Sequence, residues 1–366
     1  MLLGQSYLVP INLVSLFFIF LCCLTNNANL KILISFFMVL KHFSFSSKTY
    51  FIASDWADYF EFARTRLDWI YGRSIFSPEI IFWQTFQYFS GSPEIIFAIF
   101  LKVLTLFFLY KFFILILDHK VNALLVMVMA INTNAVWLGE TYVVRQYIAF
   151  LISMYFFLKL ISILQNKEKT SLPAASGLLF VSYPLHTGNF LFSFIMYFYS
   201  IFSVRAFRSK KATVSYLILL LSFVTLIIAG SIVTQILLLY VPTYFRHSLE
   251  GGFSFSTGLL LANSLFFYLG VCRPNSLDER TSADLKKRYQ IFGLAILSIA
   301  ICVVLLGLLN TYFHRTLMFK DIFILIIFAL TLDAYRLRFY RQKKLFLLLL
   351  TQFVSLCLPY WQHLKI

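Results

Sequence analysis

The sequence predicts an all-α protein that crosses a membrane many times. Of its 366 residues, 60% are hydrophobic and only 13% are charged, and its mean hydropathy is +0.83. Apolar runs recur along the whole chain, and a helix needs about 20 such residues to cross roughly 30 Å of hydrocarbon. Continuous runs suit helices, whose backbone hydrogen bonds are satisfied internally, rather than the alternation of a membrane barrel. We therefore expect a single polytopic membrane domain over 1–366.

The apolar runs predict about twelve transmembrane helices. A count of about ten or eleven also fits, because the runs at 30–43 and 172–185 are short enough to be re-entrant. The first run has no basic residues before it and no clear cleavage site, so we expect a retained helix and not a signal peptide. The expected ranges are 8–24, 30–43, 94–117, 122–138, 142–164, 172–185, 188–204, 213–240, 255–271, 289–309, 319–335 and 345–361.

The net charge of +16 comes mainly from basic loops that alternate along the chain. Basic residues cluster at 167–169, 205–211, 273–288 and 336–344. The positive-inside rule places these loops in the cytoplasm and both termini outside. No basic domain stands apart from the apolar runs, so the charge predicts topology and not nucleic-acid binding.

The five cysteines show neither metal-ligand nor disulfide spacing. They are scattered in or beside apolar runs, so we expect them to pack in the interior. They are Cys22, Cys23, Cys272, Cys302 and Cys357.

One long segment, 44–93, is expected on the outer side, partly as an interfacial amphipathic helix. It is acidic and rich in tryptophan and tyrosine, and it includes Asp55, Trp56, Tyr59 and Glu79. An aromatic belt with solvated charges accounts for most of these residues. Carboxylates beside aromatic rings also suit a site that handles sugars, because rings stack on sugar faces and carboxylates act as bases.

Other residues that are energetically unfavourable in a membrane are expected on the same outer side. The stretch ETYVVRQYIAFLISMYFF places Glu140 and Arg145 at the start of an apolar run, and His186, Arg246 and Arg315 lie at the outer ends of later runs. Charges at a membrane edge usually face a cavity or pair with one another. Each could therefore be a structural ion pair or a snorkelling side chain. Their convergence on one side indicates a shared anionic site, because arginine suits bidentate phosphate binding.

The order of these short elements resembles the EpsG/Wzy-type polysaccharide polymerases of bacterial O-antigen and capsule assembly. The resemblance covers roughly residues 45–320 and depends on order and spacing, since each motif is short. Ser54 stands where the family usually has glycine, and Thr187, Gly188 and Asn189 follow the histidine where a small residue and an apolar run are usual. The matching residues are Asp55, Trp56 and Tyr59 of D-W-x-x-Y, Glu79, Arg145, Gln146 and Ala149 of R-Q-x-x-A, His186, and Arg315.

The resemblance implies glycosyl transfer at the periplasmic face of the bacterial inner membrane. The substrates would be an undecaprenyl-diphosphate-linked oligosaccharide donor and a lipid-linked acceptor. A chain-length regulator protein is a possible partner. No cofactor or metal is expected, because arginines would match the diphosphate charge. Asp55 leads as the general base, His186 is second because an unperturbed histidine pKa lies near 6.5, and Glu79 is third. The expected substrate-binding residues are Arg145, Gln146, Arg315, Tyr59, Trp56 and Arg246.

Two other classes fit part of the pattern. A flippase for lipid-linked oligosaccharides would share the basic loops and interior charges, but it would not need a long acidic and aromatic outer segment. Another membrane transferase, such as an O-antigen ligase, would share an outer-face site. A ligase commonly has a large late outer loop, whereas the largest here is early, at 44–93.

Overall fold

The computed structural model describes ten parts of the chain, and all regular structure in them is helical. These parts are residues 5–44, 93–117, 119–141, 144–166, 177, 197, 255–272, 289–301, 319–336 and 342–364. The chain divides into two compact units. One unit contains residues 1–158, 174–193 and 356–366, and the other contains 159–173 and 194–355.

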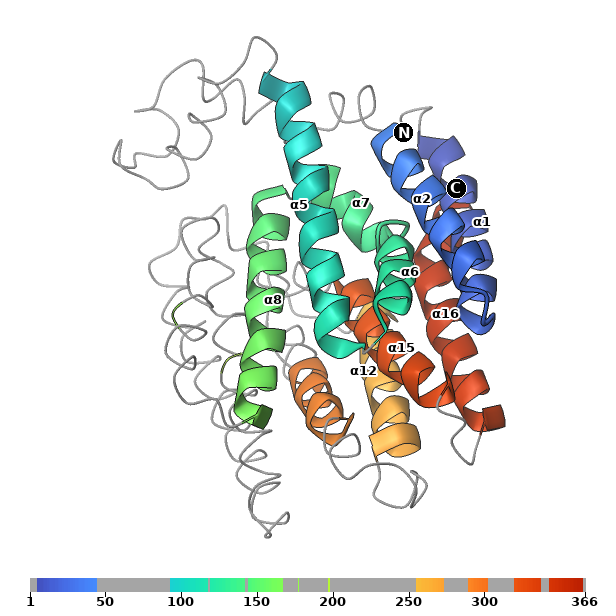
Figure 1. Cartoon of the computed structure of the whole chain (residues 1–366), viewed down its shortest axis with the longest axis vertical. Coiled ribbons are helices and arrows are strands. Elements are labelled where there is room, and N and C mark those ends of the chain that lie inside the picture. The colour runs from blue at the N-terminus through green and yellow to red at the C-terminus, as the bar shows by residue number, and fades with distance from the viewer. Residues whose placement is uncertain are drawn as a thin grey trace. The chain divides into compact units, whose positions relative to one another are not determined.

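The first unit is built around a short central helix. Helix α6 (Lys120–Ala130) packs against α1 (Gln5–Leu24), α2 (Ala28–Ser44) and α5 (Pro93–Ile116). Figure 1 shows α6 between α5 and α2. Two further helices belong here, α7 (Asn134–Thr141) and the first part of α8 (Val144–Asn166).

The second unit contains α12 (Phe255–Phe267), which continues as the π-helix η3 (Tyr268–Cys272) and packs against α15 (Lys320–Arg336). A helix over 289–301 lies beside η3, since a Cβ at Gly293 would overlap the Cys272 sulfur. Most of α16 (Gln342–Leu364) also belongs to this unit. Its interior includes hydrogen-bonded polar pairs, such as Asn263 with Ser355 at 2.9 Å.

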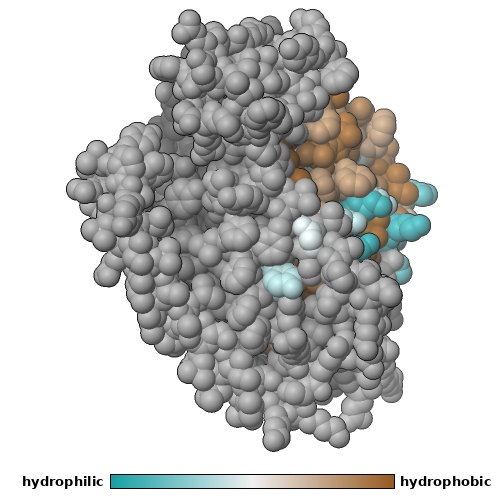
Figure 2. Space-filling view, turned by 90° about the vertical axis from the view of Figure 1, so that its left-hand side faces the viewer, coloured by the Kyte–Doolittle hydropathy of each residue, from teal (hydrophilic) through white to brown (hydrophobic). Residues whose placement is uncertain are grey.

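Helix α2 buries polar side chains and exposes apolar ones, whereas α1 buries Ser15 together with part of its apolar side chains and exposes the others. The buried residues of α2 are Lys31 and Ser35, whereas Phe36 and Phe37 are 58% and 57% exposed. On α1, Ser15 is buried and Phe18 is 53% exposed. A helix on the surface of a water-soluble protein shows the reverse arrangement. On the face shown in Figure 2, many apolar side chains of the described residues lie next to one another.

Two of the described helices are long and apolar enough to cross a membrane. They are Ala98–Ile116 within α5 and Gln342–Tyr360 within α16. The pair α6 and α7, bent by 65°, would form a third, broken span. Four shorter apolar helices accompany them among the described residues.

The expected helix at 122–138 is two helices, and local hydrogen bonds explain the break. Asn132 donates from its side chain to the Val128 carbonyl at 2.7 Å, and the Thr133 hydroxyl donates to the Ala130 carbonyl at 2.7 Å. The Thr133 backbone N–H also donates to Ala130, at 2.9 Å. These bonds satisfy the last carbonyls of α6 locally, so the helix ends there. Helix α7 then begins at Asn134 in a new direction.

The other expected ranges that fall on described residues are close to the observed helices. The range 94–117 corresponds to Pro93–Ile116, and 142–164 corresponds to Val144–Asn166. The ranges 172–185, 188–204 and 213–240 lie almost wholly outside the described residues. Of the described cysteines, Cys22, Cys23 and Cys272 are buried, as expected, whereas Cys357 is only half-buried.

Candidate functional site

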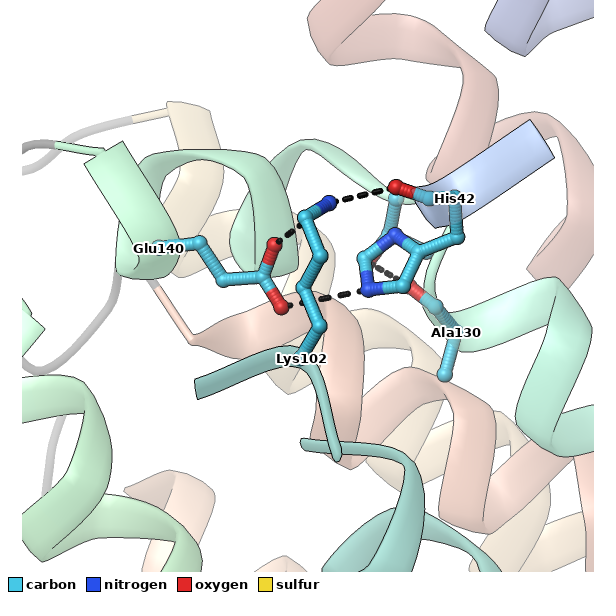
Figure 3. A network of polar contacts seen from close by, with 5 residues as sticks. His42, Lys102, Ala130 and Glu140 are labelled. Atoms are coloured by element: carbon cyan, nitrogen blue, oxygen red, sulfur yellow. Dashed lines mark hydrogen bonds and ion pairs between the residues drawn. The ribbon is translucent and has the colours of Figure 1, made fainter. Parts of the chain in front are cut away.

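A cluster of three ionisable side chains is buried where α2, α5 and α7 meet in the first unit. His42 is in the last turn of α2, Lys102 is in α5, and Glu140 is near the end of α7. Their side chains are only 8%, 3% and 2% exposed, respectively. Figure 3 shows the imidazole and the ammonium group approaching the carboxylate from different helices. We call these three residues the Glu140 cluster.

The two oxygens of the Glu140 carboxylate face different partners. His42 Nε2 lies 3.3 Å from Oε1, and Lys102 Nζ lies 3.8 Å from Oε2. Lys102 also donates a hydrogen bond to the backbone carbonyl of His42. An isolated buried charge is very costly, so this reciprocal pairing is what permits all three groups in an apolar interior.

Two further residues connect the cluster to the start of α8. Tyr147 is fully buried near Glu140. The Tyr147 ring packs so closely on Gly139 that a Cβ there would overlap it. The end of α7 is therefore fixed against the first turns of α8, because no larger residue fits between them.

The R-Q-x-x-A element lies in these first turns of α8. Arg145 is the second residue of the helix, Gln146 is 8% exposed, and Ala149 is fully buried. Glu140 belongs to α7 and not to the same helix as Arg145, although the sequence suggested that both open one apolar run. The structure thus places the element directly after a helix end that is anchored by a buried ion cluster.

The other predicted site residues lie outside the described part of the chain. The expected outer segment 44–93 also lies there, apart from its terminal residues. The residues concerned are Asp55, Trp56, Tyr59, Glu79, His186, Arg246 and Arg315.

Sequence reasoning identified Glu140 but missed His42 and Lys102. The signal was available, since Lys102 interrupts the long apolar run at 94–117 and Lys41 and His42 end the run at 30–43. Ionisable residues inside membrane-type helices usually face the bundle interior and pair there. That rule predicts buried partners, but it does not say which residues pair.

The arrangement supports two chemical properties. A carboxylate hydrogen-bonded or ion-paired to an imidazole can hold that ring in a fixed orientation. A cluster that joins three helices also fixes their relative positions. A nearby substrate-binding group needs such a rigid support to hold its substrate in one orientation. Comparison with protein-family models, with curated proteins and with solved structures finds no match for this chain.

Proposed function

We propose that this protein is a membrane-embedded polymerase of lipid-linked oligosaccharides. It would join undecaprenyl-diphosphate-linked repeat units into O-antigen or capsular polysaccharide by glycosyl transfer. The observation that carries the proposal is the placement of the R-Q-x-x-A element, with Arg145 in the first turn of α8 and Gln146 buried in the same turn. The resemblance of the sequence to EpsG/Wzy-type polymerases supplies the reaction.

The described helices support a membrane location. Two of them can span a bilayer, and α2 directs large apolar side chains outward and lysine and serine inward. Lipid favours that arrangement, because apolar side chains face acyl chains while polar groups pair inside. We extend this to about twelve helices in the bacterial inner membrane, with the site facing the periplasm, on the basis of the alternating basic loops.

The position of Arg145 favours an anionic ligand. The first turn of a helix carries a partial positive charge, so a cation there is disfavoured unless an anion is bound nearby. A diphosphate would interact favourably with both the guanidinium and the backbone N–H groups of the helix start. Gln146 adds a side-chain amide that can donate a hydrogen bond on the buried side.

The proposed reaction needs a general base and a leaving group whose negative charge is neutralised. The acceptor hydroxyl oxygen attacks the anomeric carbon of the donor sugar, the bond from that carbon to the diphosphate oxygen breaks, and the hydroxyl proton passes to the base. Asp55 is the first candidate for the base, followed by His186 and Glu79. The diphosphate leaves with its charge matched by Arg145, and by Arg315 and Arg246. Trp56 and Tyr59 would stack on the acceptor sugar.

The function can be tested with purified protein in nanodiscs and lipid-linked repeat units of one length. Products of two, three and more repeats on a gel would support polymerisation. When lipid A is also supplied as an acceptor, a product in which one repeat unit is joined to it would indicate a ligase, and no new bond at all would contradict the proposal. In a deletion strain, single repeats capped onto lipid are expected, whereas complete loss of surface glycan would indicate a flippase.

A further inference from the structure

A half-buried lysine of α2 reaches the break between α6 and α7, and the proposed function does not use it. The Lys41 ammonium lies 2.7 Å from Asn12 Oδ1, 2.8 Å from Ser15 Oγ and 2.6 Å from Asn132 Oδ1. Asn12 and Ser15 are on α1, and Asn132 is in the break itself. Lys41 comes from the last turn of α2.

These three oxygens use the full donor capacity of the lysine. An ammonium group has three N–H donors and no acceptor. The distances to Asn12 and Ser15 are in the range of charge-assisted hydrogen bonds, and the 2.6 Å distance to Asn132 is slightly shorter. Among the residues that the structure describes, no carboxylate is paired with Lys41, and the three oxygens that accept its hydrogen bonds are neutral.

The surroundings of the break suit a cation. Helix α6 ends at Ala130, and the C-terminal end of a helix carries a partial negative charge. The Asn132 carbonyl accepts a hydrogen bond from the Tyr360 hydroxyl at 2.6 Å, which fixes the residue whose side chain binds Lys41. Broken membrane helices coordinate monovalent cations with backbone carbonyls and helix C-terminal ends, and here side-chain oxygens beside a helix C-terminal end hold the ammonium group.

We infer that the α6–α7 break is a monovalent-cation site that is permanently filled by the side chain of Lys41. The ammonium group takes the place of a free ion and joins α1, α2 and the break. The wild-type protein therefore needs no inorganic cation here, and removal of the side chain should create a site for small ammonium ions or potassium.

Chemical rescue tests this inference. Lys41→Ala removes the chain from Cγ to Nζ, so n-propylammonium matches the lost atoms. We expect the purified full-length variant to unfold at a lower temperature than wild type, and propylammonium to raise its midpoint saturably, by more than about 2 °C. Neutral n-propanol at the same concentrations should not do so. Lys111→Ala is the matched control, since Lys111 is exposed on α5, and propylammonium should leave its midpoint unchanged.

A second variant and a second measurement apply if Lys41→Ala does not fold. Lys41→Met keeps the apolar stem and loses only the charged head, so ammonium or potassium should raise its midpoint relative to choline. On the wild-type chain, Lys41 should acetylate far more slowly than Lys111, and Ser15→Ala should speed acetylation of Lys41 but not of Lys102. Equal acetylation of Lys41 and Lys111 in wild type, or equal stabilisation of variants and wild type by the cations, would overturn the inference.

Discussion

His42 Nε2 lies 3.3 Å from the Glu140 carboxylate, and the two residues are separated by almost a hundred positions in the sequence. This contact joins the end of α2 to the end of α7. Lys102 of α5 completes the cluster by binding the other carboxylate oxygen and the His42 carbonyl. The ends of α2 and α7 and the body of α5 are therefore held together by one buried carboxylate.

The first prediction concerns the coupling of Lys102 and Glu140. Glu140→Gln leaves a buried ammonium without its carboxylate, and loss of one partner of a buried pair costs about 3–5 kcal/mol. The double variant Lys102→Met/Glu140→Gln removes both charges, so it should unfold at a higher temperature than Glu140→Gln alone. Thermal unfolding of the purified variants measures the coupling free energy. Lys111→Met is the matched control from the same helix, and it should combine additively with Glu140→Gln. Additive effects of Lys102→Met would contradict the pairing.

The second prediction concerns the contact between Gly139 and Tyr147. Replacing glycine by alanine within a helix normally stabilises it by about 1 kcal/mol. Gly139→Ala should nevertheless lower the unfolding temperature, because the new Cβ would overlap the Tyr147 ring. Gly270→Ala is the control, since its nearest atom, Leu348 Cδ2, is at an ordinary 3.7 Å. In a Tyr147→Ala background the penalty of Gly139→Ala should disappear. A penalty that persists there would show that the ring is not its cause.

The third prediction concerns the second unit, where the Tyr289 hydroxyl donates to the Asp333 carboxylate at 2.7 Å. Tyr289→Phe removes this donor and leaves the buried carboxylate with one hydrogen bond fewer, at a cost of about 1–3 kcal/mol. Tyr335→Phe, at a half-exposed tyrosine on α15, should change the midpoint little. In an Asp333→Asn background, Tyr289→Phe should cost less than in wild type. An equal cost in both backgrounds would exclude this hydrogen bond as the source.

The fourth prediction concerns the proposed chemistry. Arg145→Lys keeps the charge but loses the bidentate fork, so polymerisation should fall and the KM for the donor should rise, while the unfolding temperature stays near that of wild type. Asp55→Asn should lower the rate by roughly 10² to 10⁴ at saturating donor, because it removes the base and keeps the shape. If Asp55→Asn polymerises at the wild-type rate and His186→Gln is inactive at saturating donor, His186 is the base. Wild-type polymer from Arg145→Ala would contradict the role of Arg145.

The sequence by itself determined where most of the described helices lie. Helices α5 and α8 begin and end within two residues of the expected ranges. The reason is that a long apolar run has few alternatives to a helix that satisfies its own backbone hydrogen bonds. The sequence also marked Glu140 as a costly residue that would need a partner.

Only the tertiary structure decided which residues pair with Glu140. His42 and Lys102 became its partners because α2 and α5 pack beside α7 with particular faces inward, and hydropathy carries no information about the rotation of one helix against another. The break at Asn132 was missed for a related reason. Two polar residues, Asn132 and Thr133, do not lower the hydropathy of the apolar run enough to reveal a break. Lys41 and Tyr360, which bind Asn132, come from distant parts of the chain. Long-range polar pairing depends on which helices meet, so it is fixed by packing and not by local sequence.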